Sequence, residues 1–291
     1  MTRTARFSLR VSAAAALAAA AAVTAPAGVA HAAYESSPAG LGAGTTGGAG
    51  GETVTVTTAS AFTSAVTGTT ARTVRVSGKI TLANKTLVKI GSNKTVLGVG
   101  SGSGFTGGGL AVDKSSNVIL DHGKDHYDGL LDISHAADGI TVSWNKFHDH
   151  YKVSLVGHSD SNAAEDTGKL HVTYSHNWFD NVNSRLPSLR FGTGHAYDNY
   201  FRSVTDSAVH SRMNAQLLAQ NNVFESTKTC LETAGDSDVD GYLNESGNSF
   251  GGCANKITRT GSMTSAPYSF TLEPTSTVKA TVTAGAGAGR I

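Results

Sequence analysis

Two arginines, Arg185 and Arg190, stand five residues apart in the stretch SRLPSLRFG, whose Leu and Phe residues are typical of a core. In an unbroken strand this odd spacing places two side chains on opposite faces. Pro187 lies between them. Because proline fixes φ and cannot donate a ladder hydrogen bond, a regular central strand is not expected here. The sequence therefore allows a bend that brings both guanidinium groups, which suit planar recognition of carboxylates, to one site.

Three further charged residues lie upstream of these arginines. Lys152 follows FHDHY, and taken alone it would be an ordinary surface lysine; Asp128 and Asp132 form DGLLD. Calcium takes several oxygen ligands at ~2.3–2.6 Å, whereas residues four apart on a straight strand are ~13 Å apart. The two acids can share an ion only if the chain turns between them, which Gly129 permits; otherwise they are solvated turn acids. With the arginines and the lysine, they indicate a site for an acidic polymer.

An internal repeat predicts the architecture that must position these residues. A β-prone apolar stretch followed by Asn, any residue and Phe recurs, with its asparagines at Asn145, Asn177, Asn199, Asn222 and Asn248. A period in the low twenties with short strands and polar turns is typical of a solenoid. We expect an all-β parallel β-helix in which each Phe stacks in the core. Each Asn would sit in a turn, tolerate the left-handed conformation and bond to the next coil. A β-sandwich, the alternative, lacks such in-register repetition.

Helical signals are almost absent from the chain. Only 60–68 and 211–220 have the pattern of a helical turn or two. The first interval between repeats is longer than the others, and its extra residues fall in 151–169. Insertions in solenoids usually form loops on one face, often the binding face.

The N-terminal residues predict a secreted protein, and the net charge bears on its partners. Residues 1–32 combine arginines, an Ala-rich apolar run and an A-x-A site, as in a secretory signal peptide; a membrane anchor is the alternative. Residues 33–51 are a Gly/Ala-rich lead-in expected to be flexible, and 52–291 form the β-helix domain. Removing 1–32 takes three of the 23 Lys+Arg and none of the 22 Asp+Glu, which leaves a net charge of −2. We therefore expect a secreted, extracellular monomer without nucleic-acid or membrane partners.

Two cysteines, Cys230 and Cys253, are present. In a secreted chain they favour a disulfide that closes a C-terminal loop, with two buried thiols as the alternative.

Two long stretches carry a resemblance to a known family. Residues 128–161 and 176–201 resemble the secreted bacterial pectate lyases of polysaccharide lyase family 1. The resemblance extends from about Gly98 to the C-terminus. The combination of R-x-P-x-x-R-x-G with an upstream lysine and D-x-x-x-D makes it specific.

The resemblance implies a right-handed, single-stranded parallel β-helix that cleaves polygalacturonate by β-elimination to 4,5-unsaturated oligogalacturonates. Arg185 matches the residue that removes the C5 proton, and Lys152 and Arg190 match residues that hold the substrate carboxylate. Asp128 and Asp132 match two acids that bind Ca²⁺. Because arginine is normally protonated, the proposed base needs a neutral guanidine at least transiently, which predicts an alkaline optimum.

The sequence also departs from the family pattern. No V-W-I-D-H strand precedes D-x-x-x-D, and the chain appears one coil short before Asp121. A third calcium ligand has no clear counterpart, with Asp113, Asp121 and Asp125 as candidates. We therefore expect weakened calcium binding and reduced or absent activity.

Three other functions compete with this interpretation. A pectin lyase would cut the methylated polymer without calcium, and its cleft would not need a carboxylate clamp. A polygalacturonase would hydrolyse with a group of carboxylates, against which the Arg/Lys set argues. A weakly active or inactive pectin-binding β-helix would result if the apparently missing coil carried an essential calcium ligand.

Overall fold

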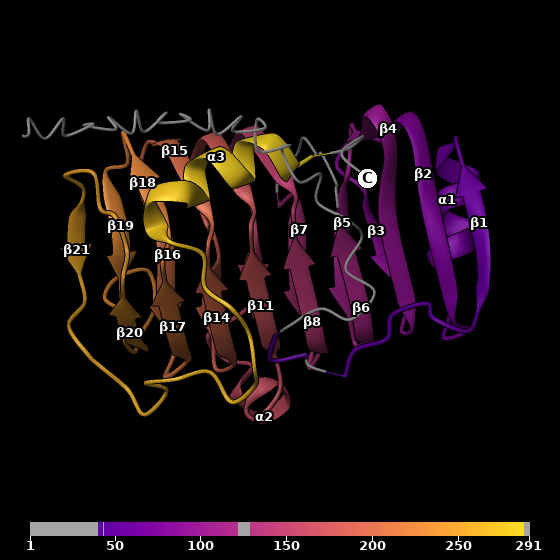
Figure 1. Cartoon of the computed structure of the whole chain (residues 1–291). Helices are drawn as coiled ribbons and strands as arrows, with labels where there is room; N and C mark the ends of the chain where they lie inside the picture. The colour runs from indigo at the N-terminus through magenta and orange to yellow at the C-terminus, as the bar shows by residue number, and fades with distance from the viewer. Residues whose placement is uncertain (1–39, 43, 122–128, 288–291) are drawn as a thin grey trace, which may run out of the picture.

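The computed structural model describes residues 40–42, 44–121 and 129–287 and shows a parallel β-helix. Successive strands lie side by side along one long axis (Figure 1), and the strand pairings within the three sheets are parallel. This confirms the predicted solenoid. Handedness, and the loss of one coil relative to the family, stay predictions. On both sides of 122–128 the ladders continue without a gap, from β4 through β6 to β8 and from β5 through β7 to β10.

Sheet 1 has nine strands among the described residues, which mark about nine turns. They are β1 (Glu52–Val56), β2 (Arg72–Thr81), β4 (Lys94–Thr106), β6 (Ser116–Asp121), β8 (Asp138–Ser143), β11 (His171–Ser175), β14 (Thr193–Tyr197), β17 (Gln216–Gln220) and β20 (Tyr242–Ser246).

Sheet 2 is the second wall, with eight strands in the same described part of the chain. They are β3 (Leu87–Ile90), β5 (Gly109–Asp113), β7 (Leu131–Ser134), β10 (Leu155–Val156), β13 (Ser188–Arg190), β16 (Ser207–Arg212), β19 (Thr229–Glu232) and β21 (Ala254–Lys256). Sheet 3 is shorter and consists of β9 (Lys146–Lys152), β12 (Trp178–Ser184), β15 (Tyr200–Val204) and β18 (Val223–Glu225).

The repeated phenylalanines form a stack inside the solenoid, as predicted. Phe147, Phe179, Phe201 and Phe224 follow one another with ring centroids 5.1, 4.8 and 4.6 Å apart, and Phe250 extends the stack at 6.0 Å. Nearly parallel rings at these distances add to the burial of apolar area.

The repeated asparagines form a buried ladder between coils. Asn199 is 0% exposed; its Nδ2 donates to the carbonyl of Tyr174 (2.9 Å) and to Oδ1 of Asn222 (2.9 Å). The predicted bonding to the neighbouring coil is confirmed. The predicted left-handed backbone falls one residue earlier, for example at His176 (φ 56°) and Asp198 (φ 52°). The residue before the Asn turns the chain, which leaves the Asn side chain directed inward.

We expect Asn199→Leu to destabilise the fold by about 3–5 kcal/mol, because several buried donors and acceptors lose their partner at once. Asn255→Leu, on the exposed strand β21, should change stability by no more than about 0.5 kcal/mol. Thermal unfolding followed by circular dichroism measures both. Equal melting temperatures for the two variants would show that the ladder does not hold the coils together.

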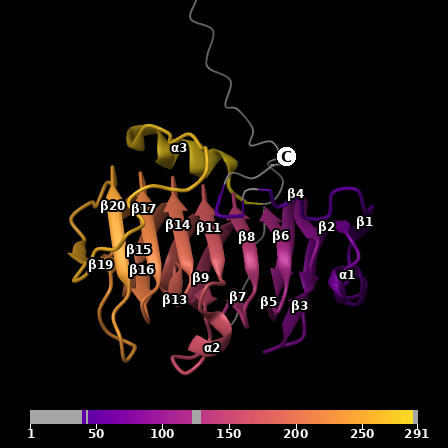
Figure 2. The same cartoon turned by 90° about the horizontal axis from the view of Figure 1, so that it is seen from below.

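Within the described part of the chain, three helices lie on the outside of the solenoid. The predicted helix near residues 60–68 is confirmed as α1 (Ala59–Val66), whose N-cap Thr58 accepts a hydrogen bond from the Ala61 N–H at 3.2 Å. It lies at the N-terminal end beside β1, β2 and β3, where it covers the first coil. Figure 2 shows the other two, α2 (Ala163–Asp166) and α3 (Thr275–Gly285), on opposite sides of the strands.

The helix predicted for 211–220 is wrong. This stretch contains the end of β16 and all of β17, separated by Met213 (φ 46°) and Asn214 (φ 59°) in the left-handed region. Two consecutive left-handed residues cannot continue a right-handed helix, so the apolar residues that follow enter sheet 1 instead.

The Gly/Ala-rich lead-in predicted to be flexible is bonded to sheet 1 where the structure describes it. The N–H groups of Thr46 and Gly47 donate to Oδ1 of Asn117 at 2.6 and 2.9 Å. A Cβ at Gly47 would collide with Thr95, and one at Gly48 would collide with the Arg72 backbone. Glycine at these two positions therefore lets the lead-in pack closely against the strands of sheet 1. The domain boundaries themselves stay predictions.

A disulfide joins Cys230 of β19 to Cys253, which confirms the predicted pairing. Among the described residues, the helices are too short or too polar to cross a bilayer. The predicted signal peptide (1–32) lies outside the described residues.

Candidate functional site

The stretch that holds the two arginines is a corner between sheets. β12 ends at Ser184 and β13 begins at Ser188, so Arg185 and Pro187 lie in the turn from sheet 3 to sheet 2. Arg185 has φ 66°, in the left-handed region, and the Leu186–Pro187 peptide is cis. Leu186 is buried in the core while Arg185 remains half-buried at the surface. The bend that the proline allowed is present.

The corner brings both arginines and the lysine to one surface hollow, which we call the basic groove. It has a volume of about 400 Å³, and its charged lining residues are Lys152, Arg185, Arg190, Arg212, Asp206 and Asp236. Lys152 ends β9 and is in register with Ser184, the residue before Arg185. The three basic residues predicted from the sequence are therefore neighbours. Among the residues that line the groove, cations outnumber carboxylates.

The inserted segment between β9 and β11 holds Arg190 in place. Arg190 is 8% exposed; its Nε donates to Asp160 and its Nη1 donates to the carbonyl of Gly157 at 2.8 Å. Asp160 also accepts from the Ser237 hydroxyl (2.8 Å) and the Asp238 N–H (3.0 Å). Burial acts to raise the pKa of Asp160, but the hydrogen bonds from Arg190, Ser237 and Asp238 together lower it below its ordinary value. Asp160 thus joins the insertion to Arg190 on the next coil and to the segment that follows β19, and it fixes the direction of Arg190.

Arg212 is a groove residue that the sequence interpretation missed. It lies on β16 in register with Arg190, and its Nε and Nη1 donate to the hydroxyls of Ser237 (2.8 Å) and Ser188 (3.2 Å). Burial first, and then the charge of Arg190, lower its pKa to about 10, and Arg185 contributes in the same direction. Arg185 and Arg190 are therefore close enough to Arg212 for their positive charges to disfavour its protonated form.

The repeat itself carried the signal for Arg212. It stands one coil after Arg190, so in-register stacking places it on the same face. The incorrect helix for 211–220 concealed this position.

A buried histidine lines the same groove. His210 is 2% exposed, and its Nδ1 lies 3.3 Å from Oε1 of Glu232. Burial, followed by the charge of Arg212, lowers its pKa to about 4. His210 is therefore neutral at ordinary pH and adds no charge to the groove.

The predicted calcium acids are only partly described. Asp128 and Asp125 lie outside the described residues. Asp132, on β7, is adjacent to the core residue Ile133 and so faces outward, and its Oδ1 accepts from the Leu155 N–H at 3.2 Å. Gly129 has φ 81° and lies against the Asp132 carboxylate, in accord with the predicted turn. Strand β7 lies two strands from β13 in sheet 2. Asp132 is therefore ~10 Å along the sheet from β13, the strand that carries Arg190 of the groove.

The other acids considered for calcium do not join Asp132. Asp113 pairs with Lys89 at 2.7 Å, and Asp121 is 2% exposed and lines an internal hollow beside Phe147. Within 40–42, 44–121 and 129–287, no three His, Cys, Asp or Glu side chains are grouped so that they could hold a metal ion. At the predicted calcium position the described residues therefore supply one outward carboxylate, that of Asp132, and not a complete site.

Comparison with known proteins gives one consistent result. A family model described as pectate lyase matches residues 120–291. The chain is 41% identical over 262 residues to a probable pectate lyase A of Aspergillus fumigatus (78% of this chain, 79% of that protein). It is 44% identical over 282 residues to pectate lyase B of Colletotrichum gloeosporioides (84% of each).

A solved structure agrees with these relatives. Pectate lyase Bsp165PelA from Bacillus sp. N165, in complex with trigalacturonate, matches at 29% identity and a TM-score of 0.75, over 87% of this chain and 99% of that one. Both sequence relatives named above are fungal, so they support the pectate lyase family but not the bacterial group that the sequence suggested.

Proposed function

Since this chain belongs to the pectate lyase family and is a polysaccharide lyase, we propose that it cleaves polygalacturonate by β-elimination in the basic groove. One observation carries the proposal: Lys152, Arg185 and Arg190 line the same groove, where a polyanion finds an excess of positive charge. The Bacillus relative is in complex with trigalacturonate, which supports an oligogalacturonate as the ligand of this groove.

The roles of the three residues follow from the chemistry of elimination. Lys152 and Arg190 bind the carboxylate of the uronate and stabilise the negative charge that grows as the C5–H bond breaks. Arg185 takes that proton. The electron pair of the C5–H bond becomes the C4=C5 double bond, and the C4–O bond breaks, so the leaving oxygen departs with its electron pair and is then protonated. This step requires a neutral Arg185. The rate of elimination should therefore rise with pH and reach its maximum in the alkaline range.

Calcium is part of the proposal. Asp128 and Asp132 would hold the ion, which would neutralise part of the charge on the substrate carboxylate. An ion held by two protein carboxylates binds weakly, because calcium takes six to eight oxygen ligands and the remainder must come from water or substrate. Calorimetric titration should therefore give weak calcium binding in the absence of polygalacturonate.

The test uses polygalacturonate with added calcium or with excess chelator, followed by the ultraviolet absorbance of the unsaturated product. We expect absorbance to rise with calcium and to remain flat with chelator. Product that forms equally well with chelator would remove calcium from the mechanism. Cleavage without ultraviolet-absorbing product would indicate a hydrolase, and the family match does not favour an inactive pectin-binding protein.

Secretion also belongs to the proposal. The Arg-containing, Ala-rich residues 1–32 are those of a cleavable leader, and the polymer substrate lies outside cells. N-terminal sequencing of protein recovered from the medium should begin at Ala33.

A further inference from the structure

A second hollow lies beside the basic groove on the outer face of sheet 3. We call it the side hollow; it has a volume of about 250 Å³, and its lining includes Asp149, Tyr151, Asn181, Asn183 and Thr205. Tyr151 and Asn183 line both hollows, so the two hollows adjoin at these residues. A polymer bound in the basic groove would reach the side hollow where it passes Tyr151.

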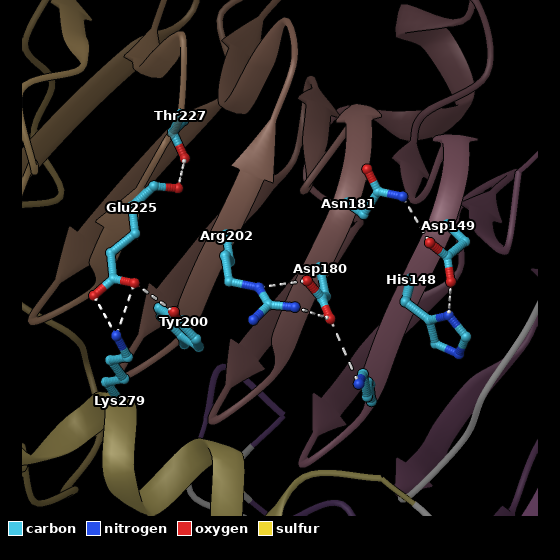
Figure 3. Close-up of polar contacts among 10 residues, drawn as sticks. His148, Asp149, Asp180, Asn181, Tyr200, Arg202, Glu225, Thr227 and Lys279 are labelled. Carbon is cyan, nitrogen blue, oxygen red and sulfur yellow. Dashed lines mark hydrogen bonds and ion pairs between the residues drawn. The ribbon is translucent and has the colours of Figure 1, made fainter.

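The backbone shapes this hollow. Asp149 and Asn181 both have φ 54°, in the left-handed region, and interrupt β9 and β12 at matching positions of neighbouring coils. Asn181 Nδ2 donates to Oδ1 of Asp149 at 2.7 Å, and the two side chains point toward each other in Figure 3. Asn183 Nδ2 donates in the same way to the Thr205 hydroxyl at 2.8 Å. Four of the side chains that line the hollow are thus hydrogen-bonded to one another in two pairs.

Tyr151 stands at the junction of the two hollows with 67% of its surface exposed. A single exposed aromatic residue needs no explanation by itself. What distinguishes Tyr151 is that it lines both the basic groove and the side hollow, next to Lys152. A flat ring in such a position can pack against the apolar face of a sugar ring.

The charges of the two hollows differ. Four cations, Lys152, Arg185, Arg190 and Arg212, line the basic groove against two carboxylates, whereas the carboxylate that lines the side hollow is Asp149, with His150 also in the lining. The hydrogen bonds from Asn181 and then His148 hold the pKa of Asp149 below its ordinary value. Asp149 is therefore ionised wherever the lyase is active, and an ionised uronate in the side hollow would meet a like charge.

We propose that the side hollow is a substrate subsite for an uncharged sugar residue, a methyl-esterified galacturonate, that neighbours the ionised residue in the basic groove. The inference rests on the proposed function and adds a preferred substrate, partly esterified pectin. Amides and a hydroxyl bind the hydroxyl groups of the sugar, Tyr151 packs against its ring, and Asp149 rejects the free acid.

The test compares Tyr151→Ala, Tyr151→Phe and Asp149→Asn with wild type on polygalacturonate and on partly methyl-esterified pectin. For Tyr151→Ala we expect kcat/KM to fall about fivefold more on pectin than on polygalacturonate, because an aromatic anchor is removed. Tyr151→Phe keeps the ring and should retain the wild-type ratio. Asp149→Asn should shift the ratio toward polygalacturonate. Leu87→Ala, an exposed apolar residue on β3, is the matched control and should leave both values unchanged.

Equal losses of kcat/KM on pectin and on polygalacturonate for Tyr151→Ala would overturn the proposal. Native gels containing either polymer and a chelator give a second measurement that does not depend on catalysis. Selective loss of retardation in the pectin gel supports the subsite, and unchanged retardation contradicts it. If wild type forms no unsaturated product from either polymer, the proposed function fails, and the gels still decide whether the side hollow binds pectin.

Discussion

Arg185→Ala and Arg185→Lys are expected to lower kcat for polygalacturonate by about a thousandfold, the range lost when a general base is removed. Arg185 lies in the turn between sheets 3 and 2, and the carboxylate-binding candidates Lys152, at the end of β9, and Arg190, on β13, line the same groove. Because the role we propose for Arg185 is to take the proton and not to bind the carboxylate, KM should change much less than kcat. Initial rates by ultraviolet absorbance measure both constants.

The variants should fold normally. Arg185 has φ 66°, and alanine and lysine face the same backbone preference as arginine. Its carbonyl accepts a hydrogen bond from the Ser154 N–H at 2.7 Å, which a side-chain substitution leaves intact. Unchanged melting temperatures would serve as the control. Near wild-type kcat in Arg185→Ala would exclude this residue as the base.

Arg190→Ala is expected to lower kcat/KM by about a hundredfold or more, through both KM and kcat. Its guanidinium is buried and directed by Asp160 and by the Gly157 carbonyl, so it is pre-arranged for one carboxylate orientation. Arg190→Lys should recover only part of the loss, since a lysine lacks the planar fork. A loss confined to stability, with normal kinetic constants in the folded fraction, would contradict this role.

Asp160 is a positioning residue in this scheme, and a double-mutant cycle isolates its effect. Asp160→Asn keeps the size of the side chain but removes the charge that directs Arg190, and we expect kcat/KM to fall about tenfold. In the Arg190→Ala background the same substitution should have little further effect on kinetics. Full additivity of the two losses would show that Asp160 acts independently of Arg190.

The repeat made the core of this fold predictable from the sequence. In a parallel β-helix, residues one period apart are spatial neighbours, so the spacing of Asn177 and Phe179 relative to Asn199 and Phe201 directly indicates contacts. Pro187 likewise marked the corner that brings Arg185 and Arg190 to one groove.

The elements that the sequence did not predict depend on tertiary contacts. The sequence of α3, TSTVKATVTAG, is rich in β-branched residues and has weak helix propensity. It is helical where Val278 and Val282 pack on Tyr200 and Val223. Lys279 of α3 pairs with Glu225 at 2.7 Å, as Figure 3 shows, and this contact between distant segments has no local signal in the sequence.

Two features of the site could not be predicted from the sequence for similar reasons. Asp160 gains its importance only when the insertion folds back over sheet 2 and meets Ser237, 77 residues further along the chain. The side hollow arises from the left-handed positions of Asp149 and Asn181, which neither residue type alone specifies.

We propose that the basic groove cleaves polygalacturonate by β-elimination and not by hydrolysis. Trigalacturonate treated with the enzyme and calcium in unlabelled water tests this most directly by mass spectrometry of the fragments. Elimination predicts fragments whose masses sum to that of the substrate, one of them with an unsaturated, ultraviolet-absorbing end. Fragments whose masses together exceed that of the substrate by one water molecule, with no unsaturated end, would contradict it and would assign the groove to a hydrolase.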